Sequence, residues 1–440
     1  MDRVCLLCDT YMKESFIPGF VKEKRKISID RLFLSLKDPL YRNSLFLLLG
    51  RLLNVGMGFL FWLIAARLYP TGEVGIATAL ITSLGLIVFI SSLGFNFSLI
   101  RYININVKEN VLSTSIIITT VAAAIVAIAY LVIVNNVLHS ISILQKTGYA
   151  LFFFITVVVN SVFFMSGEAF KALRDTRDFF LQNLALAIRV PLLLPFVFMG
   201  NFGIFGAIGV TYMISTVFSL HLLLKRANII PKIDKEYLKE SFTFSSGNYV
   251  SNLLYESPAL MMPTIILSLL GEEEAALYYI AYSVSNLIWI APMAISTSLF
   301  VEGSYGEGIK RNLIRSGVVV FILLIPSILI VYIFGSTILQ IFGEDYVEAL
   351  SLLHILVLSS FFVVLHNFFV PVLNIQMKVK ELMKVNFIRF SLLLGLSYVL
   401  LGEYGVVGFG YAWMLSYMVL TLVMLRISWR EGWICIGKNK

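Results

Sequence analysis

Twelve long apolar stretches fill the chain between Ser44 and Arg426. A helix needs about 20 mostly apolar residues to cross a lipid bilayer. The stretches therefore predict twelve membrane-spanning helices, at 44–66, 75–100, 112–134, 148–167, 179–199, 203–224, 246–270, 275–300, 312–334, 348–373, 382–402 and 405–425. The expected fold class is all-α integral membrane.

The overall composition agrees with this prediction. The chain is 59% hydrophobic and only 14% charged, which is too apolar for a soluble globular protein of 440 residues. The first 43 residues are too rich in charge for a cleavable signal peptide.

Basic residues lie almost entirely on one side of the predicted spans. Of the Lys and Arg residues outside the spans, 29 fall before the first span, in the even-numbered connections or in the tail, and only Arg67 and Lys146 fall on the opposite side. The positive-inside rule then predicts a multi-pass protein of the cell (cytoplasmic) membrane with both termini in the cytoplasm. Basic loops beside spans meet anionic lipid headgroups, so the net charge of +8 indicates membrane lipids as partners and no nucleic acid.

The two halves of the chain repeat each other at a spacing near 201. PTGEVGIATA from Pro70 matches GEEEAALYYI from Gly271, and IRVPLLLP from Ile188 matches IRFSLLLG from Ile388. Each half has six spans, an even number, so both halves have the same orientation in the membrane and the repeat is parallel. Two similar helical bundles that face each other across a substrate cavity form a transporter architecture.

The predicted organisation has five parts, and two of them carry amphipathic stripes. The parts are a cytoplasmic leader (1–43) with an interfacial helix near 27–41, an N-terminal six-helix lobe (44–224), a cytoplasmic linker (225–245), a C-terminal six-helix lobe (246–426) and a cytoplasmic tail (427–440). The linker stripe, which includes Tyr237 and Leu238, fits either a second amphipathic helix or a solvated linker.

One region resembles a known family. The run from Leu52 to Ile103 is similar to the first two spans of polysaccharide flippases, which belong to the multidrug/oligosaccharidyl-lipid/polysaccharide flippase (MOP) superfamily. The similarity is carried by ARLYP from Ala66, then EVG and SLGF, and later by GIFG from Gly203 and GVVG from Gly405. The resemblance extends over roughly residues 44–426.

The resemblance implies a fold and a function. The fold would consist of two pseudo-symmetric six-helix lobes that open alternately to each side of the membrane. The function would be to move a polyprenyl-phosphate-linked oligosaccharide from the cytoplasmic to the external leaflet, in polysaccharide or cell-surface glycan biosynthesis. The expected partners are then the polyprenyl-linked glycan and membrane lipids, with glycosyltransferases and a polymerase of the same pathway as further candidates.

Polar residues inside the first and seventh spans are the first candidates for the site. The repeat spacing places Arg51 on Asn252 and Asn54 on Tyr255, so two equivalent helices present polar faces at equivalent depths. Arg51 could clamp phosphate, because a guanidinium binds phosphate oxygens bidentately. Glu256 could bind a coupling proton or sodium ion. Alternatively, Arg51 pairs with Glu256 or snorkels toward the headgroups, and only holds the helices together.

Two further arginines occupy matching positions in the fifth and eleventh spans. Arg189 and Arg389 lie near the bilayer midplane, where charged side chains are costly and usually functional. They either grip the phosphates and sugar acids of the substrate from two sides, or each binds backbone carbonyls inside its own lobe. The charged run from Glu168 to Asp178 is predicted as a solvated loop. The predicted substrate-binding residues are Arg51, Asn54, Arg189, Asn252, Tyr255 and Arg389, with Glu256 as the ion-coupling residue.

No motif for catalysis or for a cofactor is present in the sequence. The chain has no P-loop and no G-x-S-x-G. Cys5 and Cys8 form a C-x-x-C pair, but no second pair completes a metal site. We therefore expect no catalytic residue, metal or cofactor, and an energy source such as an ion gradient or the membrane potential.

Two other functions remain open at this stage. A drug or cation antiporter of the same superfamily would need an acidic cavity, whereas three buried arginines against one buried glutamate favour an anionic substrate. An integral-membrane sugar polymerase or ligase would carry a sizeable external loop with catalytic residues, and the predicted external connections are short. We therefore expect a transporter and not an enzyme.

The distribution of basic residues generates a direct prediction of topology. Reporter fusions after Gly200 and Glu344 should read external, and fusions after Lys235 and Lys380 should read cytoplasmic, because each of these residues lies in a connection on the corresponding side. Alkaline phosphatase and fluorescent-protein reporters, active on opposite sides of the membrane, provide the measurement. An inverted result at Gly200 or Lys235 would contradict the parallel repeat.

Overall fold

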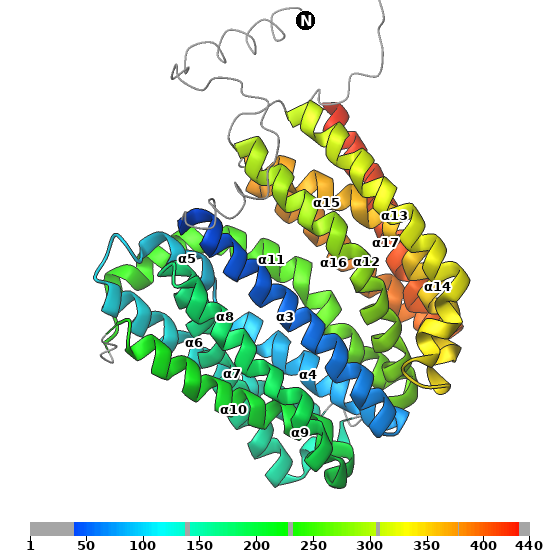
Figure 1. Cartoon of the computed structure of the whole chain (residues 1–440), viewed down its shortest axis with the longest axis horizontal. Coiled ribbons are helices and arrows are strands. Elements are labelled where there is room, and N and C mark those ends of the chain that lie inside the picture. Colours follow the sequence, from blue (N-terminus) through cyan, green and yellow to red (C-terminus); the bar gives the residue numbers. More distant parts are fainter. Residues whose placement is uncertain (1–38, 137–140, 228–231, 305–308, 377, 431–440) are drawn as a thin grey trace, which may run out of the picture. The chain divides into compact units, whose positions relative to one another are not determined.

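The computed structural model describes residues 39–136, 141–227, 232–304, 309–376 and 378–430, and these ranges contain helices and no β-strand. The predicted leader helix near 27–41 falls largely outside the described residues, and Cys5 and Cys8 fall outside them entirely. The α-helices are α3 (Pro39–Leu68), α4 (Thr71–Ser91), α5 (Phe95–Tyr102), α6 (Lys108–Asn136), α7 (Thr147–Ala172), α8 (Thr176–Ala185), α9 (Arg189–Phe196), α10 (Gly203–Leu224), α11 (Lys235–Leu270), α12 (Glu272–Ser304), α13 (Ile309–Gln340), α14 (Leu350–Leu358), α15 (Ser360–Ile375), α16 (Val379–Tyr404) and α17 (Val406–Arg430) (Figure 1).

The helices agree with the prediction of a membrane protein. In the described part of the chain, ten helices are long and apolar enough to span a bilayer, and a helix pair bent by 41° at Ser359 makes up to eleven. The one remaining predicted span, the eighth (275–300), lies within α12. The all-α integral membrane fold class is therefore confirmed.

Three of the predicted spans are interrupted, and one of them, 348–373, breaks at Ser359 between α14 and α15. The predicted span 75–100 divides into α4 and α5, because Leu93 and Gly94 both have positive φ angles, of 48° and 81°. A Cβ atom on Gly94 would lie 2.8 Å from the Cβ atom of Ser245, so this break also permits a close approach to α11. The fifth span contains a 3₁₀ turn, Leu186–Ile188, between α8 and α9. The nearby prolines lack a backbone N–H, which weakens helical hydrogen bonding in this span.

The predicted linker is partly helical. Its residues from 235 onward form the first turns of α11. Tyr237 is fully buried, and its hydroxyl lies 3.0 Å from the Ser98 hydroxyl and 2.9 Å from the Ser115 hydroxyl. The apolar stripe of this segment therefore packs against α5 and α6, which supports the amphipathic helix over the solvated linker for residues 235–245.

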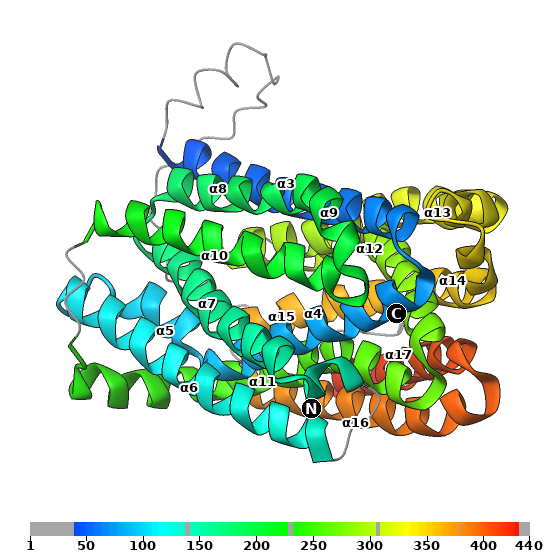
Figure 2. The same ribbon diagram turned by 90° about the horizontal axis from the view of Figure 1, so that it is seen from below.

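The two halves of the chain meet along α4. In Figure 1 the yellow-to-red helices lie at the upper right and most of the blue-to-green helices at the lower left, and in Figure 2 α13, α14 and α17 lie at the right and α5, α6 and α10 toward the left (Figures 1 and 2). The helix α4 packs against both α11 and α12. Gly75 makes the closest approach, because a Cβ atom there would overlap the backbone carbonyl of Glu272. The absence of a side chain at Gly75 thus sets the distance between α4 and the start of α12.

We expect Gly75→Ala to destabilise the protein, by about 1–3 kcal/mol, because the added methyl group must push α4 away from α12. The measurement is the Tm of the purified protein in detergent. Gly56→Ala on α3 is the matched control, since a Cβ atom at Gly56 meets nothing within 4 Å. Equal Tm values for the two variants would contradict the proposed role of Gly75.

Candidate functional site

A cavity of about 460 Å³ lies between α11 and the helices of the first half. Its volume falls in the range of roughly 300–1,000 Å³ that is typical of ligand sites. The wall combines aromatic side chains with amides and charges. The lining residues are Asn54, Gly85, Val88, Phe89, Asn160, Phe163, Phe164, Gly167, Glu168, Lys171, Phe179, Gln182, Asn183, Leu186, Tyr212, Asn252, Glu256 and Leu260.

Three of the predicted site residues come together in this wall. Asn252 and Glu256 lie four residues apart on one face of α11, and Asn54 reaches the cavity from α3. The side chains of Asn252 and Glu256 are exposed, and Glu256 forms no ion pair within the described part of the chain. The cavity therefore presents an accessible carboxylate beside two amides.

Arg51 does not line this cavity. Its side chain is exposed on α3, and no ion pair joins it to Glu256 among the described residues. The prediction that three arginines are buried is wrong at this position. The sequence places Arg51 one turn before Asn54, but it does not reveal that no neighbouring helix covers the guanidinium.

Arg189 and Arg389 make equivalent bonds in the two halves. The Nη2 atom of Arg189 donates to the backbone oxygen of Asn54 at 2.9 Å and to its Oδ1 atom at 3.0 Å. The Nη1 atom of Arg389 donates to the backbone oxygen of Tyr255 at 2.7 Å. Asn54 and Tyr255 are the residues that the repeat spacing pairs. Each arginine thus binds a carbonyl on the first helix of its own half.

The surroundings of these two arginines differ. Arg389 is only 2% exposed, and its guanidinium lies 4.4 Å from the ring centre of Tyr255 and 5.2 Å from that of Tyr417. Such cation–π contacts enclose the charge in aromatic side chains. Arg189 is half-buried and adjoins the cavity through Asn54. In this structure, Arg189 is therefore next to the candidate site, whereas Arg389 is inside the second half.

Sequence reasoning missed a charged pair in the cavity wall. The predicted solvated loop at 168–178 is wrong at both ends. The helix α7 continues to Ala172 and carries Glu168 and Lys171 into the wall, and α8 begins at Thr176 with Asp178 buried. Glu168 is 9% exposed, and its Oε1 atom lies 2.6 Å from the Lys171 Nζ atom. The i, i+3 spacing of the two residues was the available signal.

The charge balance of the cavity also differs from the prediction. Its lining contains the carboxylates Glu168 and Glu256 and one basic residue, Lys171, with Arg189 behind Asn54. Lys171 is neutralised by Glu168. The predicted excess of arginine over acid is therefore not present at the wall itself.

The two halves are joined at the end of the helices that lies away from the basic loops. Arg67 lies in the last turn of α3. Its Nε atom donates to the backbone oxygen of Ile341 at 2.8 Å, and its Nη2 atom donates to that of Gln340 at 2.7 Å. These carbonyls belong to the C-terminal end of α13, where a helix leaves acceptors unpaired and attracts cations. The Thr71 hydroxyl donates to Asp345 Oδ2 at 3.0 Å. This end is therefore closed in the structure.

Comparison with known proteins establishes the family. The sequence profile described as "Polysaccharide biosynthesis protein" matches residues 40–300. The chain belongs to this family. A second profile, MatE, matches residues 250–399. A Shigella flexneri protein named "Putative O-antigen transporter" is 24% identical over 202 residues, which are 45% of this chain and 48% of that protein. The chain thus spans about half the length of this curated relative.

Solved structures show the same fold. An inward-facing multidrug resistance MATE family transporter of the MOP superfamily has a TM-score of 0.68 at 13% identity, covering 88% of this chain and 94% of its own. The lipid II flippase MurJ, in an inward closed conformation, has a TM-score of 0.69 at 14% identity, covering 88% of this chain and 87% of its own. The family member described here has their two-lobe fold, and the resemblance to polysaccharide flippases of the MOP superfamily is confirmed.

The different surroundings of the two arginines predict different effects of the same substitution. Arg389→Gln should lower the stability of the protein by about 2 kcal/mol or more, because it removes a charge-assisted hydrogen bond together with buried cation–π contacts. Arg189→Gln should cost less stability and instead reduce transport. Tm in detergent and a transport assay on the same preparations provide the two measurements. A loss of stability that is larger for Arg189→Gln would reverse this assignment.

Proposed function

We propose that this protein is a flippase that moves a polyprenyl-phosphate-linked oligosaccharide from the cytoplasmic to the external leaflet by alternating access. The observation that carries the proposal is membership of the polysaccharide biosynthesis family over residues 40–300. The names of two relatives, an O-antigen transporter and a lipid II flippase, point to lipid-linked glycans as the substrate class. The protein would act in polysaccharide or cell-surface glycan biosynthesis.

The cavity wall has the chemistry that a glycan requires. Its amides, from Asn54, Asn160 and Asn252, can exchange hydrogen bonds with sugar hydroxyls in both directions. Phe163 and Tyr212 provide flat apolar surfaces on which the faces of sugar rings can lie. A polar and aromatic wall of this kind suits the hydroxyl groups and the ring faces of an oligosaccharide.

The phosphate groups would need the basic residues around the cavity. Lys171 can exchange its bond to Glu168 for a phosphate oxygen, and Arg189 lies directly behind Asn54. Arg51 is exposed one turn toward the basic loops on α3, so it would meet the phosphate first as the headgroup enters. We therefore propose a path from Arg51 to the cavity, with Tyr255 and Arg389 supporting α11 from behind.

Alternating access would require the closed end to open. In the proposed orientation, with both termini in the cytoplasm, the contacts of Arg67 and Thr71 close the external side. Glu256 stands in the cavity without an ionic partner among the described residues and is the proposed site of the coupling proton or sodium ion. Loading or release of that cation would change the charge where the halves meet and bias one state over the other.

A second candidate function is a drug or cation antiporter of the same superfamily. The MatE profile over residues 250–399 and the accessible carboxylate of Glu256 favour it. The relatives are named as transporters and flippases, which supports transport over an enzymatic function such as a sugar polymerase or ligase. Glycosyltransferases and a polymerase of the same pathway would be functional partners in the cell membrane.

Reconstitution into liposomes tests the proposal. With a fluorescent polyprenyl-pyrophosphate oligosaccharide in both leaflets, the protein should make the inner-leaflet pool accessible to an external quencher, and it should not extrude a cationic dye. Extrusion of the dye without movement of the lipid-linked sugar would favour the antiporter. Movement of neither substrate, in protein that is folded by its Tm, would contradict both functions.

Glu256→Gln should slow lipid translocation at least tenfold while leaving substrate binding measurable, because the neutral amide cannot load a proton or a sodium ion as the carboxylate does. The leaflet assay with imposed pH or sodium gradients is the measurement. Glu403→Gln is the matched control, since Glu403 is an exposed acid near the end of α16 and outside the cavity lining. Wild-type rates and gradient dependence in Glu256→Gln would remove Glu256 from the coupling step.

A further inference from the structure

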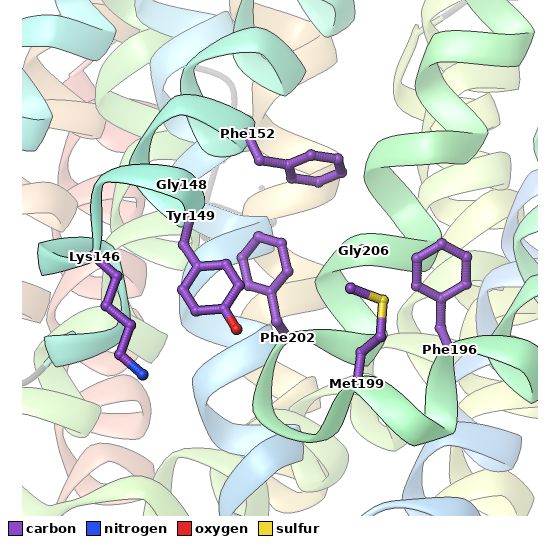
Figure 3. Close-up of a pocket in the computed structure, with 8 residues that line it drawn as sticks. All are labelled: Lys146, Gly148, Tyr149, Phe152, Phe196, Met199, Phe202 and Gly206. Atoms are coloured by element: carbon purple, nitrogen blue, oxygen red, sulfur yellow. The ribbon is translucent and has the colours of Figure 1, made fainter.

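A second hollow lies on the first half, separate from the central cavity. It is a groove of about 400 Å³ between the start of α7, the 3₁₀ helix η3 (Val197–Phe202) and the start of α10 (Figure 3). Nothing in the proposed transport function uses it. The lining residues are Lys146, Gly148, Tyr149, Phe152, Phe196, Met199, Phe202 and Gly206.

The interior of the groove is aromatic. The ring centres of Tyr149 and Phe202 lie 4.3 Å apart, and those of Phe152 and Phe202 lie 5.3 Å apart. Gly206 allows Phe196 to form the opposite wall, because a Cβ atom on Gly206 would lie 2.8 Å from the Phe196 ring. The absence of a side chain at Gly206 therefore leaves room for the Phe196 ring, and the groove beside that ring stays open.

The groove continues a surface that faces lipid. The adjoining helices expose large apolar side chains, among them Leu151 on α7 at 57%, Leu194 on α9 at 60% and Phe198 on η3 at 94%. The same helices belong to segments that are long and apolar enough to span a bilayer. In a membrane, exposed apolar side chains of this kind contact the acyl chains of lipids, so acyl chains surround the groove.

One end of the groove is positively charged. The Lys146 amine is exposed, lies 5.8 Å from the ring centre of Tyr149 and forms no ion pair among the described residues. In Figure 3 this amine lies at the end of the groove away from Phe196. The first turn of α7 begins at Thr147 without a side-chain cap, so its free N–H groups add to the positive potential. Arg67, the other basic residue predicted on this side, is occupied by the carbonyls of α13.

We propose that this groove is a binding site for one anionic glycerophospholipid of the surrounding membrane. One acyl chain lies between the aromatic walls formed by Tyr149, Phe196 and Phe202, and the phosphodiester lies beside Lys146 and the start of α7. A volume of about 400 Å³ accommodates part of a single chain and not a whole lipid. One unpaired amine matches the single negative charge of phosphatidylglycerol, and a basic site beside membrane-spanning helices is where anionic headgroups bind.

Native mass spectrometry of the purified full-length protein, titrated with phosphatidylglycerol or phosphatidylcholine, tests this site. The wild type should retain one lipid with a roughly fivefold preference for phosphatidylglycerol, the effect expected for one lysine at a headgroup. Lys146→Gln should abolish that preference. Lys225→Gln is the matched control, because Lys225 is an exposed lysine beyond the opposite end of α10. A preference that survives in Lys146→Gln would overturn the headgroup assignment.

A second variant tests the groove itself. A Cβ atom added at Gly148 meets nothing within 4 Å, and Gly148 lines the groove, so Gly148→Trp should place its ring in the groove and should remove the retained lipid of either type. Gly395→Trp, at a similarly open and exposed glycine on α16, should keep it. Retention of the lipid in Gly148→Trp would overturn the proposal. Displacement of phosphatidylglycerol by an equal concentration of a polyprenyl phosphate would overturn it as well, and would assign the groove to the tail of the transported lipid.

Discussion

One hydrogen bond, made twice, organises the interior of this protein. An arginine late in each half donates to a backbone carbonyl on the first long helix of the same half, from Arg189 to Asn54 and from Arg389 to Tyr255. A guanidinium at this depth is costly unless it has acceptors, and a helical backbone in an apolar environment has few to spare. In both halves the arginine gains an acceptor from the same position of the first long helix. The donor and acceptor residues are 135 positions apart in the first half and 134 in the second. In each half, this bond holds the helix that carries the arginine against the first long helix.

The same bond serves different purposes in the two halves. Around Arg389 the space is filled by Tyr255, Trp413 and Tyr417, and this region is part of a packed aromatic cluster. Around Arg189 the corresponding space opens toward amides and the central cavity. The two halves have similar sequences, but the region around Arg389 is packed with aromatic side chains, whereas the region around Arg189 adjoins the polar wall of the cavity. The cavity takes most of its lining from the first half, and Asn252, Glu256 and Leu260 of α11 from the second.

The sequence predicted those features that depend on one helix or on the repeat. Apolar length was enough for the all-α membrane fold, because a spanning segment has to be a helix of a certain length. The repeat spacing paired Asn54 with Tyr255 and Arg189 with Arg389 before any contact was known. The same spacing could not distinguish a lining residue from a supporting one, because that depends on which other helices pack nearby. For this reason, the exposure of Arg51 and the position of Arg389 away from the cavity both required the structure.

The exact ends of helices could not be predicted from the sequence either. The charged run after Gly167 was assigned to solvent because charges usually end a span, yet α7 continues and brings Glu168 and Lys171 to the cavity. The break at Leu93 and Gly94 lies inside a continuous apolar stretch, where hydropathy gives no signal. The break brings Gly94 against Ser245 of α11, a contact between residues far apart in the sequence that hydropathy cannot predict.

The chemistry of the closed end has a consequence for how the transport cycle could be timed. Arg67 is held by main-chain oxygens of Gln340 and Ile341, and these acceptors neither gain nor lose protons in the biological range of pH. A closure made from a carboxylate would loosen whenever acid protonated it, whatever occupied the cavity. A closure made from amide dipoles keeps the same strength on both sides of a proton gradient. The Arg67 contact would therefore not respond to a change of pH, and its separation from α13 would have to follow from a movement of these two helices.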